Sequence, residues 1–241
     1  MSFDLDNLTI IQNFICTQDK RLKMLNEEVP KMSEIFKNSK FVINYNSESY
    51  LKEIKSIYTK NVNKKNLLFK NDLHSNFAKT TLSLLAEVDT DYVMFICEDF
   101  VYLKGRSHWA AVFKEMQVNN ADFCMLAKIE KYTKKEWQNN YTEGNECFFY
   151  HSKNAPTNRG VVSIDGIYKK KNLVALLEEL RDVKEVILCD GSVSKYVNMP
   201  NFFEQYFIDE KGMKSLDWVC CLPKELITYS YHPENQAERP W

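Results

Sequence analysis

The chain has 241 residues, of which 44% are hydrophobic and 27% charged, and its formal net charge is −1. A chain of this length can bury a sizeable core, and the near-neutral charge argues against a nucleic-acid-binding protein, whose binding surface is strongly basic. Only six glycines are present and neither a GxGxxG nor a P-loop pattern occurs, so we expect no glycine-rich phosphate-binding loop.

The first hundred residues alternate between strand-like and helix-like patterns. Short runs of β-branched and aromatic residues predict strands, whereas apolar residues spaced by three and four predict amphipathic helices. We expect strands at residues 8–15, 41–45, 66–69 and 92–97, and helices at residues 19–37, 48–58 and 75–88. Pro30 falls inside the first of these helices and would kink or end it.

The strand at residues 92–97 is apolar at successive positions, which is typical of a strand buried on both faces in a parallel sheet. Together with the alternation before it, this predicts an α/β fold that is doubly wound: a mostly parallel central sheet with helices on both faces and right-handed crossovers. We find no repeat or linker-like segment and therefore expect a single domain over residues 1–241.

The second half of the chain has a less regular pattern. We expect helices at residues 107–117, 169–181 and 192–208, strands at residues 122–127 and 147–151, a loop at residues 128–146, and one or two strands near the C-terminus. Residues 106–241 are therefore an elaborated half that follows a regular first half, residues 1–105.

The seven cysteines form no CxxC pair and mostly lie in apolar runs, which is typical of reduced thiols in the core of a cytosolic protein. The N-terminal sequence MSFDLDNL carries two acids and no basic segment, unlike a signal peptide. No stretch approaches the ~18 apolar residues of a membrane span. We therefore expect a cytoplasmic protein without a transmembrane segment.

The segment YVMFICEDFVYL, residues 92–103, leads a buried strand directly into two carboxylates, Glu98 and Asp99. Ligands of open α/β sheets bind outside the carboxyl ends of the strands, so this pair lies where a site is expected. Two carboxylates there could hold Mg²⁺ or Mn²⁺ against a diphosphate. Alternatively, Asp99 is a cap that accepts backbone N–H bonds.

The alternating elements and the stretch DTDYVMFICEDFVYL resemble the first half of GT-A fold glycosyltransferases, in particular small bacterial and viral enzymes related to family 2. In that family an acidic motif follows an apolar strand that begins with Asp-Tyr. The resemblance covers residues 1–105, and Cys97 stands where the first carboxylate of the motif is expected. It implies a GT-A-like fold and transfer of a sugar from a nucleotide-diphosphosugar to an acceptor hydroxyl, with inversion and with Mn²⁺ or Mg²⁺ as cofactor.

The resemblance also implies which residues bind the donor. Thr17 and Arg21, after the first strand, would face the nucleotide, and Asn44 or Asn46, after the second, would contact the base. The segment at residues 72–79 corresponds to the donor-binding turn and the helix that follows it.

In that segment the candidates are Asn76 and Lys79. Lys79 would pair with a phosphate near the helix N-terminus, or it is a solvated lysine on an amphipathic helix. Glu98 and Asp99 would bind the donor ribose or the metal ion, and His232 near the C-terminus would be a further ligand of the metal or diphosphate.

An inverting transferase requires a general base that removes the proton of the acceptor hydroxyl. In the family this base is a carboxylate from the second half of the sheet. Asp165 and Asp190 each precede a glycine after a strand-like run, although Asp-Gly pairs also mark turns. We favour Asp190, because an apolar run precedes it and a helix is expected after it; Asp165 is second and Glu204 third.

Two other functions stay open. A non-catalytic nucleotide-sugar-binding domain would use the acids structurally and would explain the missing first carboxylate. A sugar nucleotidyltransferase would open with a glycine-rich loop after its first strand, and CTQDKRLKML contains no glycine. The expected partners are a nucleotide-diphosphosugar donor and a glycan or other hydroxyl acceptor, and no nucleic acid.

Overall fold

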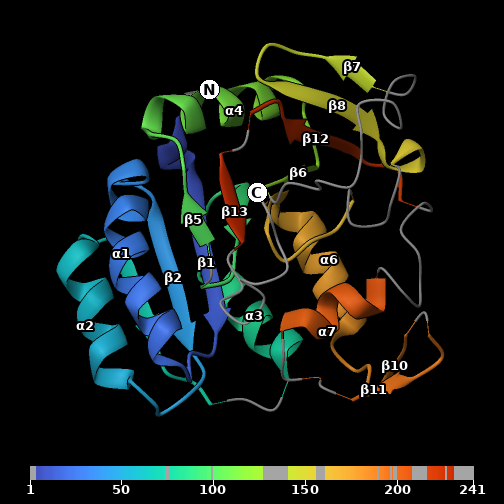
Figure 1. The fold of residues 1–241 in the computed structure, drawn as a ribbon. Coiled ribbons are helices and arrows are strands. Elements are labelled where there is room, and N and C mark those ends of the chain that lie inside the picture. Colours follow the sequence, from blue (N-terminus) through green and yellow to red (C-terminus); the bar gives the residue numbers. More distant parts are fainter. Residues whose placement is uncertain are drawn as a thin grey trace.

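The computed structural model describes residues 4–73, 76–98, 100–126, 141–155, 161–188, 190–195, 197, 200–207, 216–225 and 227–230. Figure 1 shows these residues as a large central sheet flanked by helices on both sides. Among the described helices, none is long and apolar enough to cross a membrane.

Nine of the described strands form one sheet in the order β3-β2-β1-β4-β9-β6-β12-β8-β7. Its first four strands in the chain are parallel neighbours: β1 (Leu8–Phe14), β2 (Lys40–Tyr45), β3 (Leu67–Lys70) and β4 (Tyr92–Phe95). The other five come from the second half: β6 (Phe123–Met125), β7 (Tyr141–Glu143), β8 (Cys147–His151), β9 (Gly166–Lys169) and β12 (Val219–Pro223).

Strand β9 is antiparallel to both of its neighbours, β4 and β6, and β8 is antiparallel to β12 and β7. Since β12 is parallel to β6, every strand of this sheet except β8 and β9 runs in the same direction. The predicted mostly parallel α/β sheet is confirmed, and the two reversed strands are the elaboration that the second half introduces.

The helices pack on both faces of the sheet. One face carries α1 (Asp19–Ile35), α2 (Leu51–Asn61) and α4 (Arg106–Val118); the other carries α3 (Phe77–Leu85), α6 (Lys170–Leu180) and α7 (Pro200–Gln205). Successive residues of a strand point to opposite faces, so Met94 packs in the first core while Val93 and Phe95 pack in the second. This is why β4 is apolar at every position.

Helix α1 continues through Pro30, because a proline removes only one hydrogen bond from a helix that α2, β5 and α4 hold in place by packing. Short 3-10 turns precede β1 (Leu5–Asn7) and follow β8 (Ser152–Asn154). Of the loop expected at residues 128–146, residues 141–143 form β7, which pairs with β8.

The helix expected at residues 192–208 is wrong in its first part. Strands β10 (Val186–Ile187) and β11 (Val193–Ser194) form an antiparallel hairpin, and the helix begins only at Pro200. Gly191 in the hairpin turn has φ +82°, a conformation that favours glycine and turns. Proline is well suited to the first turn of a helix, and Pro200 starts α7.

Candidate functional site

The order of the strands changes direction at β1. From β1 the chain builds outward to β2 and β3, and it then returns to add β4 on the other side of β1. In open α/β sheets, ligands bind at such a switch point, outside the carboxyl ends of the two strands. In this chain those ends are followed by residues 15–18 after β1 and by residues 96–98 after β4. In Figure 1 the carboxyl ends of β1 and β2 point downward.

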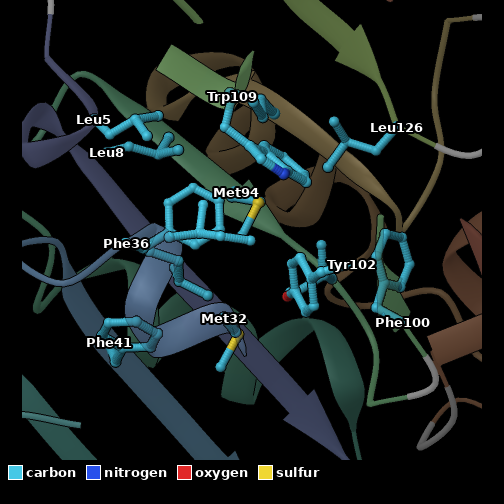
Figure 2. Close-up of a cluster of buried hydrophobic side chains, with 14 of the residues drawn as sticks. Leu5, Leu8, Met32, Phe36, Phe41, Met94, Phe100, Tyr102, Trp109 and Leu126 are labelled. Atoms are coloured by element: carbon cyan, nitrogen blue, oxygen red, sulfur yellow. The ribbon is translucent and has the colours of Figure 1, made fainter. Parts of the chain in front are cut away.

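After β4 the chain turns at Glu98 and enters β5 (Phe100–Tyr102), which pairs antiparallel with β13 (Thr228–Ser230) in a separate ribbon. Phe100 and Tyr102 are buried in the core beneath α1, and Figure 2 shows them with Trp109 in the same cluster. The apolar residues on both sides of the acids are therefore core residues, and the acids lie where the chain leaves one buried strand and enters another.

Glu98 is buried, with 4% of its side chain exposed, and it forms an ion pair with the guanidinium of Arg21 in the first turn of α1. The carbonyl oxygen of the preceding Cys97 accepts a hydrogen bond from Gln12 Nε2 at 3.1 Å, and Gln12 Oε1 accepts one from the Tyr58 hydroxyl at 2.6 Å. A buried charge is costly unless it is paired. Arg21 therefore stabilises Glu98, while Gln12 fixes the backbone beside it.

The buried hydroxyls next to this turn stay protonated. Burial raises the pKa of Tyr58 well above its ordinary value, and the charge of Glu98 raises it further. Burial also raises the pKa of Tyr102 well above its ordinary value. The nearby Tyr58, Glu28 and Asp165 raise it further through their charges. Both phenols are therefore neutral at physiological pH, so Tyr58 is a hydrogen-bond donor to Gln12.

Three carboxylates are buried among the described residues: Glu28, Glu98 and Asp165. Glu98 lies in the turn from β4 to β5, Asp165 lies beside the end of β4, and Glu28 contacts the far end of β5. Glu28 Oε2 accepts the backbone N–H of Tyr102 at 3.0 Å. Acids are seldom fully buried, and unusual environments of ionisable groups concentrate at functional sites, so we assign the candidate active site to this turn.

Asp165 reaches this edge through the reversed strand β9. It precedes Gly166, which lies opposite Phe95 of β4, and its carbonyl oxygen accepts the N–H of Leu126 at 3.1 Å. Because β9 runs against β4, the start of β9 lies beside the carboxyl end of β4. The structure thus brings Asp165 and Glu98 to the same edge of the sheet.

Asp190 lies in the exposed turn between β10 and β11, and no helix starts behind it. Its Oδ1 accepts hydrogen bonds from the backbone N–H of Ser192 at 2.9 Å and from the Ser192 hydroxyl at 2.6 Å. These bonds lower the pKa of Asp190 below its ordinary value. They are the contacts of an Asx turn. The hydrogen bonds of the Asp190 carboxylate to described residues all lie within this turn.

Asn76 and Lys79 both have structural partners at the start of α3. Asn76 Oδ1 accepts the N–H of Lys79 at 2.9 Å as the N-cap of the helix, and its Nδ2 donates to the carbonyl of Arg181 at 3.1 Å. Lys79 Nζ lies 3.3 Å from a carboxylate oxygen of Asp182. These contacts connect the start of α3 to the end of α6.

Of the residues expected after β1 and β2, Thr17 is exposed in the loop after β1. Asn44 is fully buried, and its amide binds Asn13 Oδ1 at 3.1 Å and the backbone of Asp72 at 2.9 and 3.2 Å. Asn44 therefore fixes the loop after β3 from below the surface. An amide so completely buried and hydrogen-bonded does not face a ligand.

Asp99 and His232 lie outside the described residues, as does the side chain of Glu204. Within the described ranges, no group of three or more His, Cys, Asp or Glu side chains could hold a metal ion. Glu98, the one described carboxylate of the acidic pair, is engaged by Arg21. The described residues do not by themselves fit a metal centre.

Glu28 is not among the residues predicted from the sequence. Its signal was present, because Glu28 lies three residues after Leu25 and four before Met32, which places an acid on the apolar face of the predicted helix. An acid at such a position needs a buried partner, but the pattern does not say that the partner is the backbone of β5.

No protein-family model matches the chain, and no curated protein matches it in sequence. Solved structures do match. A crystal structure of S. aureus TarS residues 1–349 aligns with a TM-score of 0.54 at 11% identity, over 95% of this chain and 61% of that chain. A second structure of S. aureus TarS gives 0.51 at 14% identity, over 93% and 36%.

A third match is the mannosyltransferase PcManGT from Pyrobaculum calidifontis in complex with GDP-Man and Mn²⁺, with a TM-score of 0.48 at 11% identity over 92% of this chain and 58% of that chain. This chain thus spans less than two thirds of the length of each of these three chains. TarS is a glycosyltransferase, and at such low identity its likeness supports a GT-A-like fold alone.

Proposed function

We propose that the chain is a glycosyltransferase that moves a sugar from a nucleotide-diphosphosugar to the hydroxyl of a glycan or another acceptor. The observation that carries this proposal is that two buried carboxylates, Glu98 and Asp165, lie at the carboxyl end of β4, beside the switch point of the sheet. The GT-A-like fold supports a nucleotide sugar as the ligand of that edge.

In this proposal residues 1–105 bind the donor and residues 106–241 bind the acceptor. Thr17 and Arg21 lie at the end of β1, where the nucleotide would bind. Arg21 keeps 23% of its side chain exposed while it pairs with Glu98, so its guanidinium can offset part of the diphosphate charge without leaving Glu98 unpaired. Asn76 and Lys79 would contact the donor only by exchanging their present partners.

Asp165 is our preferred general base, ahead of Asp190, because β9 brings it to the edge where β4 ends. In an inverting reaction the acceptor oxygen forms a bond to the anomeric carbon as the bond from that carbon to the diphosphate oxygen breaks. The hydroxyl proton passes to the Asp165 carboxylate, and the nucleoside diphosphate leaves with the bonding electrons. Hydrogen-bond donors and cations of the chain stabilise the charge that develops on it.

We further propose that Asp99 and His232 bind Mn²⁺ or Mg²⁺ at this edge. Asp99 immediately precedes Phe100 in the chain, and His232 follows Ser230 by two residues. Phe100 and Ser230 are paired in the β5–β13 ribbon, which supports a common site.

Calorimetry with UDP, GDP and CDP, each with and without Mn²⁺, tests the proposal. We expect one of these to bind, and we expect Asp99→Ala to weaken that binding by about tenfold or more, as loss of a charged contact does. The matched control is Asp89→Ala, because Asp89 is exposed and its carboxylate lies 3.4 Å from the amine of Lys40.

The outcomes separate the candidate functions. Binding accompanied by donor hydrolysis or sugar transfer supports the glycosyltransferase. Binding without either reaction favours the non-catalytic nucleotide-sugar-binding domain, a reading consistent with Glu98 being held by Arg21. Failure of all three nucleotides to bind would contradict both. Nucleotide binding that is unchanged by Mn²⁺ and by Asp99→Ala would contradict the proposed metal site.

A further inference from the structure

We infer that Glu28 is a positioning residue that holds the acidic turn after β4 in place by binding the backbone of β5. The inference rests on the proposed function, because β5 follows the turn in which Glu98 pairs with Arg21, a residue proposed to bind the donor.

One face of α1 contacts the segment from Glu98 to Tyr102 at both of its ends. Arg21 and Glu28 are seven residues apart, which is two turns of helix, about 10.5 Å along one face. Arg21 pairs with the Glu98 carboxylate at the start of the segment, and Glu28 accepts the N–H of Tyr102 at its end. Phe100–Tyr102 form β5, so one face of α1 holds both the residue Glu98 before this strand and the last residue of the strand.

The attachment at Tyr102 satisfies one backbone N–H of β5. Within the described part of the chain, β5 has one strand neighbour, β13, and the N–H of Tyr102 is bonded to Glu28 Oε2 at 3.0 Å. A buried backbone N–H without a partner is costly, and here a helix side chain supplies what a second neighbouring strand would supply. The position of β5 relative to α1 therefore depends on this carboxylate.

Burying the Glu28 carboxylate to make that contact costs free energy, because a charged group loses its hydration. The residue is 6% exposed and lies among the apolar residues that α1 packs on the sheet. Its charge is offset by Lys31, whose Nζ lies 2.6 Å from Glu28 Oε1, and by the Tyr102 N–H. An apolar residue would avoid the desolvation cost of a buried charge, whereas only an acceptor can bind the Tyr102 N–H of β5.

Two substitutions at one position test this inference. Glu28→Gln keeps an amide oxygen that can accept the Tyr102 N–H and loses the charge; Glu28→Ala loses both. We expect Glu28→Ala to weaken binding of the nucleoside diphosphate that the unaltered protein binds by about tenfold, in line with the loss of one hydrogen bond to a charged group, and Glu28→Gln to restore most of it. Fast hydrogen exchange at the Tyr102 amide is expected in Glu28→Ala only.

Glu115→Ala is the matched control for stability. Glu115 on α4 also accepts backbone N–H bonds, from Glu146 and Cys147 at 2.7 Å each, but at the turn between β7 and β8. We expect it to lower thermal stability while leaving nucleotide affinity and exchange at Tyr102 unchanged.

Three results would overturn the inference: unchanged affinity in Glu28→Ala, equal loss in Glu28→Ala and Glu28→Gln, or unchanged exchange at Tyr102 in Glu28→Ala. If the unaltered protein binds no nucleotide, the proposed function fails by itself, and hydrogen exchange still decides whether Glu28 positions the segment.

Discussion

Asp165 and Asp190 both precede glycine, but the two glycines serve different purposes. A Cβ on Gly166 would lie 2.2 Å from the Phe123 ring and 3.1 Å from the carbonyl oxygen of Cys124, whereas a Cβ on Gly191 would meet nothing within 4 Å. Gly166 therefore permits close packing of β9 against β6, while Gly191 provides the positive φ of a turn. The same dipeptide introduces a buried acid in one place and an exposed hairpin in the other.

Substituting each aspartate in turn shows which of the two, Asp165 or Asp190, acts as the general base. We expect Asp165→Asn to lower the rate of sugar transfer by about 100-fold or more, which is typical of the loss of a general base, with donor affinity retained. We expect Asp190→Asn to stay within about twofold of the unaltered rate, since it perturbs a solvated turn. Initial rates measure the effect and calorimetry with the donor confirms that the site is intact; the opposite ranking would move the base to Asp190.

Asn76, which the resemblance assigns to donor binding, has a structural role at the start of α3. Asn76 caps the helix through Lys79 N–H and also reaches the end of α6 through Arg181. The capping bond satisfies one of the N–H groups that the first turn of a helix leaves without a partner. Helix capping alone therefore explains an asparagine at this position, without a role in donor binding.

Helix capping and donor binding predict different results at this position. Asn76→Ala is expected to lower the free energy of unfolding by about 1–2 kcal/mol through the lost cap and the lost bond to Arg181. Asn76→Asp is expected to retain the cap and to lose only the bond to Arg181, since aspartate accepts the Lys79 N–H but cannot donate to a carbonyl. Donor affinity is expected to stay unchanged in both variants. Denaturant unfolding and calorimetry measure the two quantities; reduced affinity in Asn76→Asp while the cap is retained would instead assign the amide to the donor.

The chain closes on itself at the amino end of the sheet, where segments far apart in sequence meet. Arg106, in the first turn of α4, binds carboxylate oxygens of Asp4 at 2.9 Å and Asp6 at 2.8 Å, and it donates to the carbonyl of Ile35 at 2.7 Å. Burial acts to raise the pKa of Asp6, but hydrogen bonds from Arg106 and Asn38 outweigh it, so the pKa lies below the ordinary value of 3.8.

This pairing predicts how stability depends on pH. Because the pKa of Asp6 is lower in the folded chain, its contribution is complete above the ordinary value and is lost as the pH falls through the folded-state pKa. We expect Asp6→Asn to cost about 0.5–1 kcal/mol at pH 7, the range for partly exposed ion pairs, and the difference to vanish in strong acid. Unfolding midpoints against pH measure it, with the exposed Asp89→Asn as control; a difference that persists in acid would contradict the assignment.

The sequence by itself determined the alternation of strands and helices, the buried character of β4 and the position of the acidic pair at its end. These follow from side-chain periods of two and 3.6 residues, which are local properties of the chain. For the same reason the hairpin at Asp190 was missed: four residues in two short strands carry too little periodicity to outweigh a helix-like pattern.

Only the tertiary structure decided which side chains meet at the end of β4. Arg21 and Glu98 are 77 residues apart, and Glu28 and Tyr102 are 74 apart. Asp165 reaches this edge because β9 inserts between β4 and β6 in the opposite direction. No local pattern encodes these contacts, since strand order and direction follow from how both cores pack against one sheet, and the buried charges then have to find partners where that packing leaves them.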